Sequence, residues 1–225
     1  MLLAVDTSTA QLGLAIYDGS PGQVIGEQTW RNLQGAHHTA ELAPAIADLL
    51  RRCGLAMEDV HVLGVAIGPG SFTSLRVGLA LVKGLALARQ LPVVGVPTLD
   101  ILAAGQAAAR KPLAVVIQAG RGRLALGWYK SSRNGWQSKG PARVVTVDGL
   151  IEEVTSPVIV CGELTTAERQ KLMEKPEIRL LSPARSVRRP ALLAELAWSR
   201  WLAGDVDEEA TLAPIYLHVA GSIPA

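Results

Sequence analysis

The stretch Val60-His61-Val62-Leu63-Gly64-Val65-Ala66-Ile67, Gly68-Pro69-Gly70, Ser71-Phe72-Thr73-Ser74 and onward to Arg89 decides the fold of this chain. Its short β-branched apolar run predicts a buried strand. Two glycines around a proline, which fixes its own φ, predict a sharp turn. Ser71 is a suitable N-cap for a helix that runs to Arg89. Such a turn directs the positive end of a helix to whatever lies above the sheet, so the stretch suggests a phosphate site.

Length and composition set the class of protein. A chain of 225 residues can bury a substantial core in one large domain or two small ones. The 22 Lys and Arg nearly balance the 20 Asp and Glu, so the global charge does not argue for nucleic acid, although local basic patches remain open. Cys53 and Cys161 lack metal-type spacing and indicate a reduced protein. Neither a signal peptide nor a membrane-length apolar run is recognisable, so we expect a cytoplasmic protein.

The first half of the chain predicts a domain of βββαβαβ order over residues 1–97. Apolar runs and turn residues indicate strands that form an antiparallel meander, a helix, the central strand and helix, and a closing strand. The expected strands before the central stretch are 2–5, 12–17 and 23–30, the first helix is 39–52, and the closing strand is 92–96.

The second half predicts a smaller domain over residues 98–225, in which strands again alternate with helices. We expect the apolar tail at 212–217 to pack back on the body. The chain is therefore read as an α/β protein of two domains, each with a mixed sheet flanked by helices. Its expected strands are 113–117, 124–130, 143–147 and 158–160, and its expected helices are 98–110, 165–174 and 189–203.

Two polar loops are candidates for phosphate binding. A carboxylate and two hydroxyls directly after the first strand could hold a magnesium-bound phosphate. The same side chains could instead bond their own backbone in a turn. The glycine-proline turn has the same ambiguity, and it lacks the lysine of a P-loop. The candidate loop residues are Asp6, Thr7, Ser8, Gly68, Pro69, Gly70 and Ser71.

Metal and nucleophilic chemistry find little support in the sequence. The adjacent His37 and His38 cannot both point from one helix face, and four residues further on stand Glu41 and Leu42. No serine lies in a Gly-x-Ser-x-Gly turn. We therefore expect neither a metal site nor a catalytic triad.

The helix 72–89 has features of a docking element. Gly78 and Gly84 each cost about 1 kcal/mol relative to alanine in a helix interior. With Ala80 and Ala88 they leave tracks of small residues that let another helix approach closely. This helix could pack only against its own sheet, or it could satisfy the sheet on one side and a partner on the other. In the second case we expect the partner to contact His38, Leu42, Ile46, Leu49, Phe72, Leu75, Arg76, Gly78, Leu79, Val82 and Lys83. Bulky residues at Gly78 or Gly84 should then block the partner and leave the chain folded.

These blocks together resemble the bacterial TsaB (YeaZ) family, most densely over residues 1–110. The resemblance rests on Val5-Asp6-Thr7-Ser8, on His38 to Pro44, on Gly68-Pro69-Gly70-Ser71-Phe72-Thr73 and on Gly95-Val96-Pro97-Thr98-Leu99. It implies an actin/Hsp70-like (ASKHA) fold. It also implies a non-catalytic, cofactor-free partner of TsaD in forming N6-threonylcarbamoyladenosine at position 37 of ANN-decoding tRNAs. The family further implies the ATPase TsaE as a partner, contact with tRNA through the complex, and a homodimer when the chain is alone.

The sequence departs from this family in ways that bear on function. Gln118-Ala119-Gly120-Arg121 stands where the family usually has Asp-Ala-Arg, while Ser74 replaces a glycine and His218 an arginine. The first change weakens the case for magnesium-nucleotide binding. A small ASKHA phosphotransferase that uses Asp6 and the glycine turn remains the alternative function. A glycoprotease-like metalloenzyme would need a metal pair that the sequence does not supply. Several cations could form a basic edge or be scattered surface charge: Arg121, Arg123, Lys130, Arg133 and Lys139.

Overall fold

The computed structural model describes residues 1–31, 38–133 and 135–217, and for residues 38–40 it describes the backbone alone. The chain divides into two compact units. The first unit is Met1–Ile101 with Arg188–Ile215, and the second unit is Leu102–Val187 with Tyr216–Ala225. This differs from the expected single boundary at residue 97, because a late segment of the chain returns to the first unit.

The first unit is built on a five-stranded sheet of order β3-β2-β1-β4-β5. The pairs β1–β2 and β2–β3 are antiparallel, whereas β4 runs parallel to both β1 and β5. The expected meander and mixed sheet are confirmed. The strands are β1 (Leu2–Asp6), β2 (Gln11–Asp18), β3 (Gln23–Arg31), β4 (Val62–Gly68) and β5 (Val93–Pro97).

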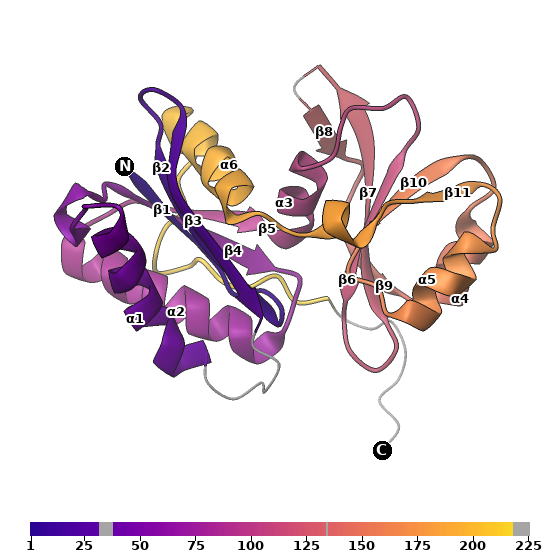
Figure 1. Ribbon diagram of the computed structural model, residues 1–225, viewed down its shortest axis with the longest axis horizontal. Coiled ribbons are helices and arrows are strands. Elements are labelled where there is room, and N and C mark those ends of the chain that lie inside the picture. The colour runs from indigo at the N-terminus through magenta and orange to yellow at the C-terminus, as the bar shows by residue number, and fades with distance from the viewer. Residues whose placement is uncertain (32–37, 134, 218–225) are drawn as a thin grey trace. The chain divides into compact units, whose positions relative to one another are not determined.

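Helices cover both faces of this sheet (Figure 1). On one face lie α1 (His38–Arg52), α2 (Phe72–Arg89) and the short turn η1 (Met57–Asp59). The apolar residues of α1 and α2 pack on side chains such as Leu3 and Val5 of β1. On the opposite face, α6 (Pro190–Leu202) packs its Leu193 against Leu2 and Ala4 of β1. Because strand side chains alternate between faces, β1 is buried on both sides.

The helix α2 has the bounds that the sequence predicts. The Ser71 hydroxyl accepts a hydrogen bond from the backbone N–H of Ser74, which satisfies one free donor of the first turn. At the other end, Gln90 adopts a left-handed conformation with φ of 51° and closes the helix.

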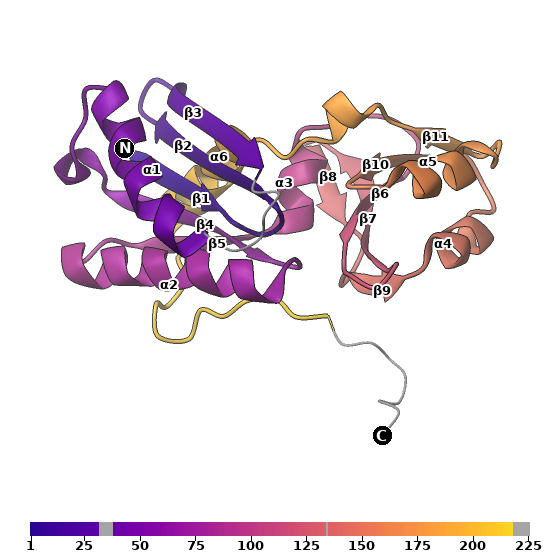
Figure 2. The same cartoon turned by 60° about the horizontal axis from the view of Figure 1, so that its bottom comes forward.

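The second unit holds a six-stranded mixed sheet with helices packed on it (Figures 1 and 2). Its strand order is β11-β10-β6-β7-β8, and β9 also pairs with β7. Leu150 and Leu172 of the flanking helices enter the core of this unit. The elements from the unit boundary onward are α3 (Thr98–Ala104), β6 (Leu113–Gln118), β7 (Leu124–Ser132), β8 (Gly135–Ser138), β9 (Arg143–Val145), α4 (Val147–Glu153), β10 (Val158–Gly162), α5 (Thr166–Met173), β11 (Ile178–Leu180) and η2 (Pro183–Ser186).

Two expectations about this region are wrong. The helix from Thr98 ends at Ala104 rather than Arg110, because Gly105 follows and the alanines beyond it bring almost no apolar surface to bury. The expected strand 143–147 ends at Val145, because the Thr146 side chain caps α4 by accepting a hydrogen bond from the N–H of Gly149. Across the described ranges, every helix is too short or too polar to cross a membrane.

Candidate functional site

The two candidate phosphate loops form one site at the carboxyl ends of β1 and β4. These neighbouring parallel strands deliver both loops to the same edge of the sheet, where ligands of open α/β sheets commonly bind. The backbone N–H of Ser71 donates to the carbonyl of Ser8 at 2.7 Å, and the Thr7 hydroxyl donates to the carbonyl of Ser74 at 2.8 Å. A Cβ at Gly70 would overlap the Ser8 carbonyl, so only glycine fits there.

The glycine turn is also in contact with the returning chain. Gly68 has a φ of +104°, a conformation that side chains rarely adopt, and it precedes Pro69 through a cis peptide bond. The backbone N–H of Ile215 donates to the carbonyl of Ile67 at 2.7 Å. A side chain at Gly68 would press on the Ile215 backbone. The end of the first unit is therefore fastened beside this turn.

The Asp6 carboxylate is occupied by partners from its own chain. Nε of Arg188 donates to its Oδ2 at 2.9 Å, and the Ser8 N–H and hydroxyl donate to its Oδ1 at 2.9 Å and 2.5 Å. The side chains of Arg188 and Asp6 are 0% and 2% exposed. A buried charge is tolerated when it is paired and hydrogen-bonded, as here. The carboxylate is thus neither free nor accessible to a metal-bound phosphate.

Further contacts fix Arg188 in place. Its Nη2 donates to the Thr9 hydroxyl at 2.8 Å and to the Gln11 carbonyl at 3.2 Å. The Gln11 side-chain amide in turn donates to the Arg188 carbonyl at 2.6 Å. Sequence reasoning missed Arg188, because it is 182 residues from Asp6 and no local pattern marks it. The Arg188 guanidinium therefore binds the loop that follows β1 and supplies its positive charge from within the protein.

Most residues expected at a partner interface lie instead in the core of the first unit. They pack α1 and α2 on the sheet and on each other, so a partner cannot reach them without disrupting that core. These residues are Leu42, Ile46, Leu49, Leu75, Leu79 and Val82. Gly78 also faces inward, since a Cβ there would overlap the Thr7 side chain. The side chain of His38 lies outside the part of the chain that is described.

Two of the expected interface residues, Phe72 and Arg76, are exposed and lie on an outer face of α2. We define this face as Phe72, Arg76, Ala80, Gly84 and Leu87, of which the last three are not in the expected set. All five are exposed, and their spacing of three or four residues aligns them along the helix. Phe72 is 52% exposed and Leu87 74% exposed, large values for apolar side chains. The Arg76 guanidinium lies 3.6 Å from the centre of the Phe72 ring. A Cβ at Gly84 would meet nothing within 4 Å. Lys83, half-buried beside this face, donates to the Ala210 carbonyl at 3.5 Å.

In the second unit, Gln118 has a structural role. Its side-chain amide donates to Oε2 of Glu168 at 2.8 Å and to the carbonyl of Glu163 at 3.2 Å. The same Oε2 of Glu168 accepts from the N–H of Thr165 at the start of α5. A carboxylate at position 118 would face Glu168 with like charge, which explains why an amide suits this position.

In the described ranges, the other chemically reactive groups form no second site. Burial raises the pKa of the Cys161 thiol to about 12, so this thiol stays protonated and is a poor nucleophile at neutral pH. Among the residues with described positions, no three His, Cys, Asp or Glu side chains gather as metal ligands would.

Comparisons with known proteins agree with the family resemblance. The model of the family described as "TsaD: tRNA N6-adenosine threonylcarbamoyltransferase" matches residues 32–156. The "tRNA threonylcarbamoyladenosine biosynthesis protein TsaB" of Bacillus subtilis is 30% identical over 174 residues, which cover 76% of this chain and 74% of the relative. The protein of that name from Escherichia coli is 35% identical over 104 residues, which cover 46% of this chain and only 43% of the relative.

Solved structures are similar over nearly the whole length. The structure titled "YeaZ from Pseudomonas aeruginosa" has a TM-score of 0.76 and 27% identity, and covers 96% of this chain and 99% of that one. A Bacteroides thetaiotaomicron protein with an actin-like ATPase fold has a TM-score of 0.51 at 10% identity, over 85% of this chain and 95% of that one. The second likeness concerns the fold alone, and it agrees with the expected actin-like architecture.

Proposed function

This chain belongs to the TsaB (YeaZ) family, and from that premise we propose that it is a non-catalytic subunit of a tRNA-modifying complex. In this proposal it forms a heterodimer with a TsaD-type threonylcarbamoyltransferase, in the cytoplasm. The product is N6-threonylcarbamoyladenosine at position 37 of ANN-decoding tRNAs. The relatives from Bacillus subtilis and Escherichia coli are named for the biosynthesis of this nucleoside.

The observation that carries the non-catalytic role is the buried Asp6–Arg188 ion pair. A phosphotransferase would need this carboxylate to hold the waters of a magnesium ion beside the phosphates. Here the Asp6 side chain is only 2% exposed, and its charge is already balanced by Arg188. This arrangement favours the subunit role over the alternative of an ATP-dependent phosphotransferase.

The outer face of α2 is the surface on which we place the TsaD-type partner. Its ends carry exposed Phe72 and Leu87, and between them Ala80 and Gly84 leave the backbone open to close approach. Apolar anchors beside small residues suit helix-on-helix packing. The same face would support a homodimer when the chain is alone. The ATPase TsaE joins as a further partner, and tRNA is engaged through the complex.

Reconstitution tests this function. An unmodified tRNA transcript is incubated with TsaD and TsaE from the same organism and with threonylcarbamoyl adenylate, in the presence or absence of this chain. The modified nucleoside is then quantified by mass spectrometry. We expect product only when the chain is present, and none from the chain alone. Equal product without the chain would refute the proposed function.

A further inference from the structure

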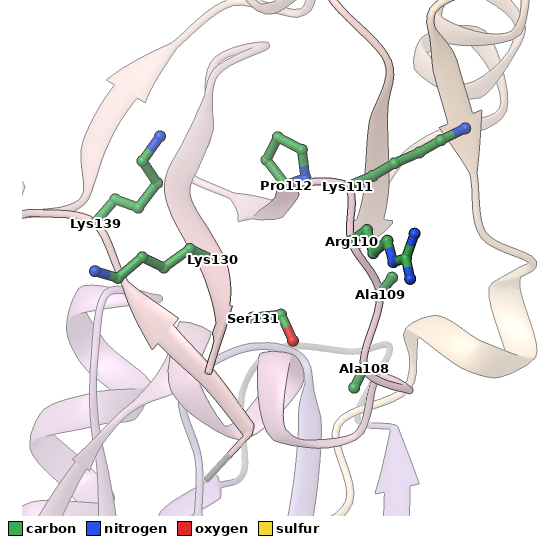
Figure 3. Close-up of a pocket in the computed structure, with 8 residues that line it drawn as sticks. All are labelled: Ala108, Ala109, Arg110, Lys111, Pro112, Lys130, Ser131 and Lys139. Atoms are coloured by element: carbon green, nitrogen blue, oxygen red, sulfur yellow. The ribbon is translucent and has the colours of Figure 1, made fainter. Parts of the chain in front are cut away.

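An open groove of about 620 Å³ lies on the second unit (Figure 3). Arg110 and Lys111 come from the segment that leads into β6, while Lys130 and Lys139 line the other side. The register of the sheet places these two segments next to each other, because β6 pairs antiparallel with β7 and Leu113 lies opposite Tyr129. The N–H of Lys139 donates to the carbonyl of Trp128 at 2.8 Å, which holds Lys139 close to Lys130.

The groove lies in the most basic part of the chain. Residues 101–147 contain eight Lys and Arg and no Asp or Glu. The second unit as a whole has thirteen Lys and Arg against seven Asp and Glu, a formal charge of +6. The first unit has nine against thirteen, a formal charge of −4. The near-neutral total thus conceals two oppositely charged units.

The protein itself does not neutralise the groove. All four cations are exposed, and none of them forms an ion pair with an acidic side chain in the described ranges. Elsewhere in the same unit, Arg143 pairs with Glu153 and Lys171 with Asp148. Exposed cations without acidic partners give this surface a positive potential, which attracts an anionic ligand.

We propose that this groove binds the phosphate backbone of RNA. Within the proposed function, on which this inference rests, that RNA is the tRNA to be modified. In Figure 3 the charged ends of Arg110 and Lys111 point away from Lys130, so the cations lie around the rim of the groove. Long side chains at a rim can contact phosphates of one strand that crosses it. Among the described residues, the rest of the lining is Ala108, Ala109, Pro112 and Ser131, which offer no aromatic ring on which bases could stack. The groove therefore positions RNA and does not read its sequence.

The test measures binding of a fluorescent unmodified tRNA transcript to the full chain by anisotropy over a range of salt concentrations. The groove variant combines Arg110→Gln, Lys111→Gln, Lys130→Gln and Lys139→Gln. We expect it to bind more than about tenfold more weakly. The slope of the logarithm of the binding constant against the logarithm of the salt concentration should become shallower by about one for each lost phosphate contact.

A matched control makes the same change in charge elsewhere on the second unit. It combines Lys171→Gln, Lys175→Gln, Arg179→Gln and Arg185→Gln, and it should retain binding within about threefold if the groove is the site. Urea unfolding of both variants checks that each remains folded. An equal loss in both variants, an unchanged groove variant, or a wild-type chain that does not bind tRNA would each overturn the inference.

Association with TsaD is measured separately on the same variants. We expect the groove variant to co-purify with TsaD as the wild type does. Loss of TsaD binding with unchanged tRNA binding would make the groove a protein interface and refute its role toward RNA. Failure of the wild type to support modification would refute the proposed function instead, so the two failures are distinguishable.

Discussion

At the scale of residues, Asp6 and Arg188 share a buried ion pair although 182 positions separate them. Removing two charges from water costs several kcal/mol per ion, and close pairing with further hydrogen bonds offsets that cost. Here Ser8, Thr9 and Gln11 supply those additional bonds. The pair fixes the end of β1 to Arg188, two residues before α6 begins, and it buries the carboxylate away from solvent.

We predict that Arg188→Met lowers the free energy of unfolding by about 3–5 kcal/mol, because it leaves the Asp6 charge buried without a partner. Urea denaturation at neutral pH measures this loss. The control is Arg189→Met, since Arg189 is exposed and pairs with Glu27 at the surface, and its loss should cost no more than about 1 kcal/mol.

The double variant Asp6→Asn/Arg188→Met keeps this prediction testable if Arg188→Met does not fold. Removing the charge of Asp6 should restore part of the lost stability, so the two changes should not add. Equal effects of Arg188→Met and Arg189→Met, or strictly additive effects of the two buried changes, would contradict the role assigned to the ion pair.

At the scale of elements, α2 has two faces of different use. Its inner side packs Leu79 and Val82 on the sheet and buries Leu75, and Gly78 accommodates the Thr7 side chain. Its outer face is exposed and includes Gly84, next to which there is open space. A side chain at Gly78 would therefore collide with the core, whereas a side chain at Gly84 would extend into open space.

We predict opposite effects of alanine at these two positions. Gly84→Ala should raise the free energy of unfolding by up to about 1 kcal/mol, because alanine favours the helix and has room. Gly78→Ala should lower it by about 1–3 kcal/mol, because Thr7 is buried and held by its bond to Ser74 and cannot move aside cheaply. Thermal and urea unfolding measure both. Changes of the same sign would contradict this account of α2.

The sequence predicts the existence of most elements because local signals mark them. Ser71 caps α2, and the turns that separate β1, β2 and β3 contain glycine, proline or small polar residues. It does not separate the two faces of α2, because Leu79 and Leu87 have the same chemistry and only packing distinguishes them. The expectation that a bulky residue at Gly78 leaves the chain folded conflicts with the structure, since a Cβ there would overlap the Thr7 side chain.

At the scale of the whole molecule, the chain leaves the first unit near Ile101 and returns to it at Arg188. No local pattern could predict that return. It depends on the fit of α6 to the second face of the sheet and on the pairing of Arg188 with Asp6. The separation of charge between the units likewise becomes visible only once the chain is divided this way.

The affinity of this chain for a TsaD-type partner, measured by calorimetry, tests the central claim most directly. Leu87→Glu places a charge on the outer face of α2, and we predict that it weakens the complex by more than about tenfold. The control is Met173→Glu in α5 of the second unit, where Met173 is 69% exposed, and it should leave the affinity unchanged. If the chain with Leu87→Glu binds the partner as tightly as the wild type does, the outer face of α2 is not the docking surface.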